Sequence, residues 1–213
     1  MDNSLYVGLS KQLVLQRQMD IIANNIANAD TSGFKVEQLA VAEYPQAPAF
    51  TLGGPAPVKF VMPNGVIRDF GQGALRKTDS PFDVAVDGQG FFRVQTPAGE
   101  RYTRDGRFRA DEAGRLVTQG GERIGKLGVV SFANLSTLEK TGDNLMKNTS
   151  NQAPTPVADP RLRQGMLEGS NVNPILEITK MIEVSRSYER MARMMDSQND
   201  LSTQAVQQLG KAA

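Results

Sequence analysis

The chain contains 213 residues, with 24 basic and 23 acidic side chains and with neither cysteine nor histidine. The missing cysteines exclude disulfides, thiolate metal sites and cysteine nucleophiles, and the missing histidines remove the commonest general base and metal ligand. The near-neutral charge gives no general attraction to nucleic acid or to an anionic membrane surface. No segment approaches the ~20 apolar residues that cross a bilayer. We therefore expect a protein that is not an enzyme, with no cofactor, no metal, no nucleic acid partner and no membrane insertion.

Residues 1–35 are expected to form an N-terminal helical segment. Apolar side chains recur there at alternating three- and four-residue spacings, the pattern of a helix that packs against another helix. The seam consists of Leu5, Leu15, Met19, Ile22 and Ile26, with Gly8 and Gln12 as its weak positions. Turn-forming residues from Asn28 to Gly33 predict that the helix ends near Asn28.

Residues 36–80 are expected to be an extended linker followed by a β-hairpin. Four prolines and a Gly-Gly pair fall between Val36 and Pro57 and predict irregular chain there. Asn64-Gly65 lies between two short apolar runs, which predicts a hairpin turn.

Residues 81–148 are expected to form a small antiparallel β-domain. The first strand is predicted from the alternation of Phe82, Val84 and Val86, and a turn at Asp87–Gly90 leads to a return strand. Regularly spaced glycines then separate further short strands.

Three carboxylates in this domain, Asp105, Asp111 and Glu112, offer the enzymatic alternative. A pair of carboxylates can act as general acid and base, but Asp-Gly and Asp-Glu sequences usually lie in solvated turns. Asp105-Gly106 is itself predicted as a hairpin turn. We therefore expect a structural role for these residues.

Residues 149–173 are expected to be a second linker, and residues 174–213 a C-terminal helical segment that opens at Asn173-Pro174. Its seam consists of Ile178, Met181, Tyr188, Ala192 and Met195, with Ser185 as a polar interruption. The predicted fold class is α+β: long N- and C-terminal helices pair as a coiled coil, with a small antiparallel β-domain between them. On spacing alone, the seams also fit an ordinary helical hairpin within one monomer.

Three stretches carry a resemblance to a known family. They read ANNIANADTSGFK at 23–35, YTRDGRF at 102–108 with GRLVT at 114–118, and LEGSNVNP at 167–174. Together they are similar to the signatures of the axial proteins of the bacterial flagellar rod and hook, in the same order. The opening LYVGLS and the short length look most like the proximal rod protein of that family. A distal rod protein is the near alternative, and an exported wall-cleaving enzyme is a remote one.

The resemblance implies a structural subunit of the flagellar basal-body rod that assembles with copies of itself and with other rod proteins. It implies an axial tube that transmits torque and encloses the export channel. It also implies a periplasmic location, reached through the flagellar type III export apparatus without a cleaved signal peptide. The first residues agree with this expectation, because they lack the basic and long apolar regions of a signal peptide.

The expected assembly interface combines the two seams with the asparagines around the end of the first helix. Its residues are Leu5, Leu15, Met19, Ile22, Asn24, Asn25, Ile26, Asn28, Ile178, Met181, Tyr188 and Met195. For the asparagines, plain helix termination is the alternative to hydrogen bonding with neighbouring subunits.

One segment departs from the family pattern. Only Gln119–Gly125 separates the strand that ends in Leu-Val-Thr from the next apolar run, where the family normally has a longer β-segment. Either the middle domain is shortened or residues are missing from the chain.

Overall fold

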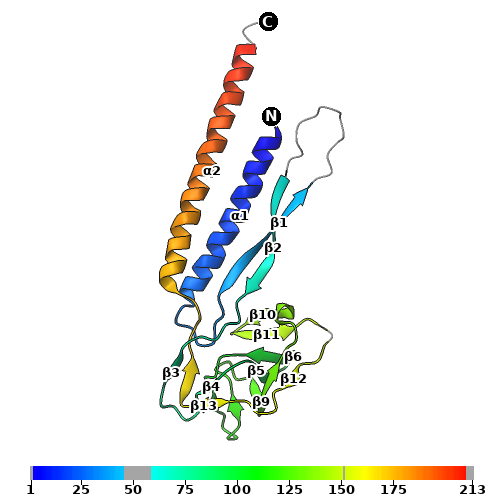
Figure 1. Ribbon diagram of the computed structural model, residues 1–213, viewed down its shortest axis with the longest axis vertical. Coiled ribbons are helices and arrows are strands. Elements are labelled where there is room, and N and C mark those ends of the chain that lie inside the picture. Colours follow the sequence, from blue (N-terminus) through cyan, green and yellow to red (C-terminus); the bar gives the residue numbers. More distant parts are fainter. Residues whose placement is uncertain (1, 46–58, 151, 210–213) are drawn as a thin grey trace. The chain divides into compact units, whose positions relative to one another are not determined.

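The computed structural model describes residues 2–45, 59–150 and 152–209, and the chain divides into two compact units. Unit 1 consists of Met1–Ile26, Glu37–Ile67 and Pro174–Ala213, and unit 2 consists of Ala27–Val36 and Arg68–Asn173. The chain therefore enters and leaves unit 2 through unit 1, and each unit is built from segments that are distant in sequence (Figure 1).

Unit 1 contains the two α-helices and one pair of strands. Helix α1 spans Asp2–Ala27 and helix α2 spans Pro174–Leu209, so α2 begins at the predicted proline. Strands β1 (Glu37–Pro45) and β2 (Lys59–Arg68) form a two-stranded sheet. The linker expected from Val36 onward is thus a strand as far as Pro45, and residues 46–58, with the predicted Gly-Gly pair, lie outside the described residues.

The hairpin predicted at Asn64-Gly65 is wrong, because β2 runs without interruption through both residues. Gly65 has a φ of +104°, so the pair has the backbone freedom that suggested a turn. In a two-stranded sheet each strand keeps one free edge, which also tolerates Pro63. The partner of β2 is β1, on the far side of the undescribed segment.

The coiled coil expected for the two helices is also wrong, although the fold is α+β. The two helices touch in one apolar cluster, but the predicted seam residue Ile178 of α2 is 49% exposed. On α1, Val14 and Ile21 are buried as well as their seam neighbours, and residues one position apart point ~100° away from each other. Helix α1 therefore buries a wide face, and Figure 1 shows it between α2 and the β1–β2 pair.

Unit 2 is built on an antiparallel sheet with the strand order β10-β11-β6-β5-β9-β8-β7, and β12 also pairs with β9. At its centre β5 (Phe91–Thr96) pairs with both β6 (Gly99–Thr103) and β9 (Arg123–Ser131). The remaining elements are β7 (Arg109–Ala110), β8 (Leu116–Val117), a 3-10 helix (Leu135–Thr137), β10 (Leu138–Gly142), β11 (Leu145–Asn148) and β12 (Thr155–Pro156). The antiparallel β-domain predicted from the glycine spacing is confirmed.

Two further strand pairs bring the end of unit 2 back to its beginning. Strand β3 (Leu75–Lys77) pairs with β14 (Met166–Glu168), and β4 (Val84–Val86) pairs with β13 (Leu162–Gln164). The return strand expected next to β4 is thus wrong, because β4 does not pair with β5. The segment expected as a linker after residue 149 contains β12, β13 and β14. Phe82, expected to point inward, is 44% exposed.

The main core of unit 2 is an apolar cluster that packs side chains of the central strands β5 and β9 against those of β4. Phe92 and Val94 are fully buried, and the ring of Phe92 meets that of Phe108 edge to face at 5.1 Å. Gly106 crosses the backbone of β4 so closely that a Cβ atom there would lie 1.7 Å from the carbonyl oxygen of Val84. Gly106 is therefore a close-approach glycine, and the hairpin turn predicted for Asp105-Gly106 is wrong.

The short connection after β8 is a closed turn. The N–H of Thr118 donates to the carbonyl of Glu122 (2.9 Å), and the N–H of Gly121 donates to the carbonyl of Thr118 (3.1 Å). The Thr118 hydroxyl also donates to the Glu122 carboxylate. Gly121 adopts a φ of +89°, as a tight turn requires. The 213 residues therefore close the sheet without further chain at this point.

Candidate functional site

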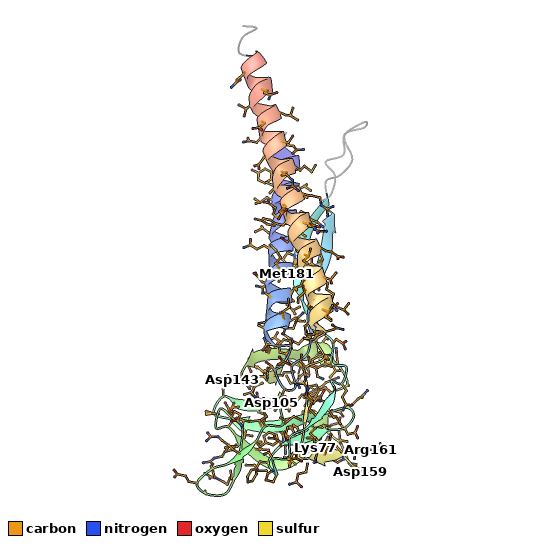
Figure 2. The ribbon with its side chains drawn as sticks, turned by 90° about the vertical axis from the view of Figure 1, so that its left-hand side faces the viewer. Lys77, Asp105, Asp143, Asp159, Arg161 and Met181 are labelled. Carbon is orange, nitrogen blue, oxygen red and sulfur yellow. The ribbon has the colours of Figure 1, made fainter. Side chains whose placement is uncertain are left out.

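The predicted helix seam forms one apolar cluster within unit 1. Leu15 and Ile22 of α1 and Val184 of α2 are its buried centre. Partly buried side chains pack against it, namely Met19, Ile26, Met181 and Tyr188 (Met181 is labelled in Figure 2). Gly8 lies against Met195, since a Cβ at Gly8 would meet its Cγ at 3.0 Å. Val184 was missed because it lies beside the predicted seam of α2.

Other predicted interface residues lie elsewhere. Ile178 and Asn24 are exposed on their helices, and Asn28 belongs to unit 2. The side chain of Leu5 lies outside the described residues. The structure thus brings the middle of the two seams together, and the described residues leave the start of the α2 seam, at Ile178, half exposed.

Asn25 is the polar node of unit 1 and is only 1% exposed. Its amide oxygen accepts from the N–H of Glu37 (2.9 Å), and its amide nitrogen donates to the carbonyl of Glu37 (2.8 Å) and to the carboxylate of Glu177 (2.9 Å). Glu177 is also buried and pairs with Lys180 at 2.6 Å. Asn25 therefore ties α1 to β1 and to α2, and its amide is used within the chain.

Unit 1 exposes most of the large apolar side chains on the described surface, twelve of fourteen. Two rows follow helical spacing: Tyr6, Leu9 and Leu13 on α1, and Ile175, Ile178 and Ile182 on α2. The others in unit 1 are Val41, Met62, Ile67, Leu176, Met194 and Leu201. Large contiguous patches of exposed apolar side chains are typical of protein interaction sites.

Unit 2 contains a buried cluster of three charges. Lys35 Nζ lies 2.5 Å from Oε1 of Glu168, and Arg104 Nη1 lies 3.0 Å from Oε2 of the same carboxylate. None of the three residues is more than 4% exposed. Among the described residues, Glu168 is the only carboxylate that forms an ion pair with either cation. We call this cluster the charge triad.

Backbone groups complete the coordination of the charge triad. Lys35 Nζ donates to the carbonyl of Gly71 and Arg104 Nη2 donates to that of Gly88, both at 2.7 Å. Glu168 Oε1 accepts from the N–H of Gly73 at 3.0 Å. The Arg104 guanidinium also lies over the ring of Phe91, 5.3 Å from its centroid. Its Nε has no hydrogen-bond partner in the described part of the chain.

Two cations share one carboxylate, so the charge triad has an excess of positive charge. Burial lowers the pKa of the Lys35 ammonium below its ordinary value, the ion pair with Glu168 opposes this shift, and Arg104 adds to it. Burial likewise lowers the pKa of Arg104, again opposed by Glu168. Arginine keeps its proton under these conditions. Glu168 is thus the group that makes the burial of both cations tolerable.

The backbone around the charge triad is equally constrained. Gly33 has a φ of +68° and its N–H donates to the carbonyl of Glu168 (2.8 Å), while a Cβ there would lie 2.5 Å from the Arg104 backbone. Asn171 accepts from the N–H of Val36 (2.8 Å) and donates to the carbonyls of Asp69 and Gly71. These contacts hold the first and last segments of unit 2 together.

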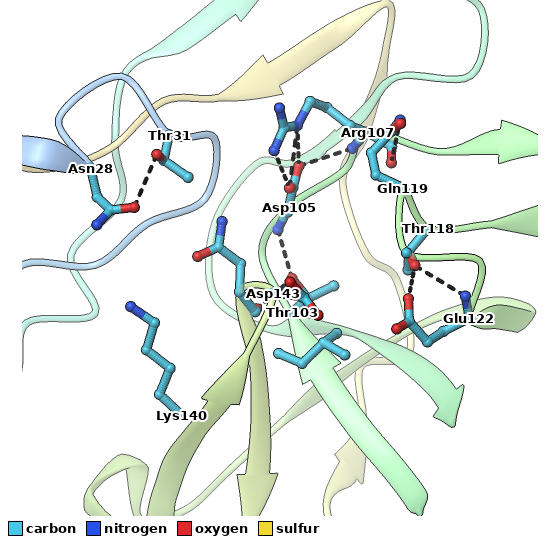
Figure 3. A pocket seen from close by; sticks show the side chains of 13 residues that line it. Asn28, Thr31, Thr103, Asp105, Arg107, Thr118, Gln119, Glu122, Lys140 and Asp143 are labelled. Atoms are coloured by element: carbon cyan, nitrogen blue, oxygen red, sulfur yellow. Dashed lines mark hydrogen bonds and ion pairs between the residues drawn. The ribbon is translucent and has the colours of Figure 1, made fainter. Parts of the chain in front are cut away.

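A polar hollow of about 520 Å³ lies elsewhere in unit 2 (Figure 3). Its rim includes Asn28, Asp105, Lys140 and Asp143. Lys140 Nζ lies 4.5 Å above the ring centroid of Phe34. Polar and charged groups of both signs line the hollow, and no set of them converges as a catalytic constellation does.

Two of the three carboxylates of the enzymatic alternative are engaged by neighbouring groups, and the third is exposed. Asp105 forms a two-point ion pair with Arg107 (2.8 Å for Nη2 to Oδ2), visible in Figure 3. Asp111 accepts from the N–H groups of Ala113 and Arg115 and from the Arg115 side chain, and these bonds lower its pKa. Glu112 is exposed. The described residues contain no group of histidine, cysteine or carboxylate ligands that could hold a metal, and no described helix is long and apolar enough to span a membrane.

Comparison with known proteins gives three family matches along the chain. The model of the flagella basal body rod protein matches residues 5–35, that of the flagellar hook protein FlgE/F/G D1 domain matches 85–143, and that of the flagellar basal body rod FlgEFG protein C-terminal region matches 163–208. The chain is 50% identical over 243 residues to the flagellar basal-body rod protein FlgF of Caulobacter vibrioides, with 99% of each chain covered. The chain belongs to the flagellar basal-body rod protein family.

More distant members of this family match nearly the whole chain. It is 30% identical over 250 residues to FlgF of Mesorhizobium japonicum, with 99% of each chain covered. It is 28% identical over 259 residues to the rod protein FlgG of Caulobacter vibrioides, with 97% of this chain and 98% of that one covered. The alignment with the first FlgF spans more residues than the 213 of this chain, so that relative contains residues without a counterpart here.

The three family matches meet in the charge triad. Lys35 is the last residue of the first match, Arg104 lies in the second and Glu168 lies in the third. The three motifs that suggested a rod or hook protein thus each supply one charged group to a single buried site. The sequence motifs include these three residues but do not predict that they lie close together in space. Their place in the motifs was the only signal for it.

Proposed function

We propose that this chain is a structural subunit of the flagellar basal-body rod, of the FlgF type and in the proximal position that the sequence resemblance implies, and that it is not an enzyme. The observation that carries the proposal is the 50% identity to a FlgF over 99% of both chains. A FlgG-type subunit is the second candidate, and the lower identity of 28% to FlgG of the same organism ranks it below.

The proposed assembly surface is the exposed apolar part of unit 1. Its rows on α1 and α2 would pack against copies of this chain and against other rod proteins, because water-exposed rows of this kind are stabilised by a partner's apolar side chains. Contacts that join different patches of successive subunits build a helical tube when they do not close into a ring. Such a tube would transmit torque and enclose the export channel.

The predicted interface residues have different roles in this proposal. One group would hold α1 and α2 together so that neighbouring subunits meet a fixed surface, and Asn25 would fix β1 to this helix pair. The group consists of Leu15, Met19, Ile22, Ile26, Met181, Tyr188 and Met195. Ile178 and Asn24 would contact neighbours directly because both are exposed. We further propose export through the flagellar type III apparatus to a periplasmic rod, as the resemblance implies.

A wall-cleaving enzyme is the alternative from another class. Catalysis of that kind needs two carboxylates that converge on one bond. Two of the carboxylates that sequence analysis singled out, Asp105 and Asp111, are instead engaged by Arg107 and Arg115, and Glu112 is exposed. This arrangement supports the structural proposal.

The test is incorporation of an Ile178→Asp variant into basal bodies. Ile178 is exposed, so the purified variant should retain the circular dichroism of the wild type, while a charge on a buried contact should abolish incorporation. Thr179→Asp adds the same charge at the next exposed position, outside the apolar row, and should be incorporated. Normal incorporation of Ile178→Asp would contradict the proposed surface.

A further inference from the structure

Glu168 reaches the charge triad from very far along the chain. It is separated by 133 residues from Lys35 and by 64 from Arg104. Contacts of such sequence separation form late in folding because a long loop must close first. The central strands β5, β6 and β9 lie within 41 residues of each other in sequence and need no contribution from the last segment of unit 2 to pair.

The last segment of unit 2 supplies pairings that nothing else in the described chain replaces. Strand β3 pairs with β14, and the N–H of Thr78 donates to the carbonyl of Gly165 (2.8 Å). Strand β4 pairs with β13. Before this segment arrives, no described carboxylate forms an ion pair with Lys35 or Arg104, and two unpaired cations cannot be buried side by side.

We propose that Glu168 is a closing residue: Lys35 and Arg104 keep the first segment of unit 2 from packing until the last segment inserts Glu168 between them. The triad makes completion of unit 2 conditional on the C-terminal part of the chain. The first and last segments, 27–36 and 162–173, then lock in one step on a sheet that has already formed. If the chain is exported unfolded, which rests on the proposed function, the triad delays the final packing of unit 2. Packing then waits until nearly the whole chain has left the export channel.

The test is pulsed hydrogen exchange during refolding of the purified full chain. Three amides report closure: those of Gly33, Gly73 and Thr78, which donate to Glu168 or to Gly165. Amides of β5 and β6 report the sheet. In the wild type the sheet amides should become protected first and the three closure amides later, in one common phase.

Glu168→Gln keeps the shape of the side chain and leaves both cations without a carboxylate. Protection of the Gly33 and Thr78 amides, which bond to backbone carbonyls, should fall by about 100-fold or more, the usual effect of breaking a buried ion pair. The sheet amides should gain protection at the wild-type rate. Asp87→Asn is the matched control: it removes an ion pair to Arg163 of the same last segment, but one at the surface, and it should leave closure unchanged.

A third variant separates the closing role from simple packing. Replacing both cations together with the acid, as Lys35→Met/Arg104→Met/Glu168→Gln, removes the unpaired charges and should restore much of the lost protection at Gly33 and Thr78. Failure of this rescue would overturn the proposal, as would closure amides that gain protection together with the sheet in the wild type. Loss of the sheet amides in Glu168→Gln would overturn it too. All of these outcomes concern the isolated chain, so they are independent of whether the rod assignment holds.

Discussion

Unit 2 buries its apolar side chains and three of its charges, whereas unit 1 leaves apolar rows on both helices exposed. Only Phe82 and Leu135 are large, exposed apolar side chains in the described part of unit 2, against twelve in unit 1. Unit 2 thus buries nearly all of its large apolar side chains by itself, whereas unit 1 leaves apolar side chains exposed that a partner would cover. The same chain combines a unit that buries nearly all of its large apolar side chains with a unit whose exposed apolar rows fit the proposed association with other subunits.

The largest expected effect is the destabilisation of unit 2 by a substitution at Gly106, which lies against the backbone of β4. Gly106→Ala would place a Cβ 1.7 Å from the Val84 carbonyl oxygen, so β4 and the 106 segment must separate. We expect a loss of more than about 4 kcal/mol in the free energy of unfolding, measured by urea denaturation. Gly125→Ala, at an exposed glycine with no atom near the added Cβ, should change it by less than about 1 kcal/mol. Equal stability of the two variants would refute the close approach.

The next effect should fall on unit 1 alone. Ile22→Asp places a charge in the α1–α2 cluster, which costs about 3 kcal/mol or more per subunit, so incorporation into basal bodies should fail. Unfolding of unit 2 in urea should stay as in the wild type. Gln16→Asp, on an exposed position of α1, is the control and should be incorporated. A destabilised unit 2 in Ile22→Asp would show that the two units are not separate.

A smaller change should weaken unit 1 without breaking it. Asn25→Ala leaves the backbone groups of Glu37 and the carboxylate of Glu177 without their amide partner, at a cost of about 2 kcal/mol. We expect assembled rods to dissociate at a lower temperature than the wild type. Rods that carry Gln16→Ala should dissociate at the wild-type temperature, and the account of Asn25 fails if both variants behave alike.

The smallest effect concerns pH and unit 2. Because the fold lowers the pKa of Lys35, the unfolded chain binds more protons between that lowered value and the ordinary 10.5. The contribution of Lys35 to the free energy of unfolding should therefore rise as the pH rises through this window. The difference in unfolding free energy between the wild type and Lys35→Met, measured at pH 7 and pH 10, should shift in favour of the wild type. A shift toward the variant would mean that the pKa is raised instead.

The parts that sequence analysis predicted well have local causes. Asn173-Pro174 predicts the first residue of α2, since the proline lacks an N–H that the first turn cannot use anyway. The spacing of Leu15, Met19, Ile22 and Ile26 predicts that these side chains share one face, and they do meet in a cluster. Both signals are contained within a few residues of chain.

The parts that failed depend on distant partners. Asn64-Gly65 has the chemistry of a turn, but both residues lie inside β2, which pairs with the distant β1 and stays extended. The coiled coil failed because the neighbours Val14 and Ile21 are also buried, which no heptad count includes. Nothing in the local sequence distinguishes Glu168 from an exposed glutamate. Its buried ion pair depends on Lys35, which is 133 residues away in the sequence.

The comparison between the units is tested most directly by hydrogen exchange of the purified chain at high dilution, set beside that of the same chain in assembled rods. The account predicts that amides of β5, β6 and β9 are protected in both samples. It predicts that residues before Thr31 and after Pro174 exchange with little protection in the free chain and become strongly protected in the rod, because helices are marginal in water without tertiary packing and α1 and α2 share a single apolar cluster. Strong protection of both helices in the dilute free chain would contradict the central claim that partners complete unit 1.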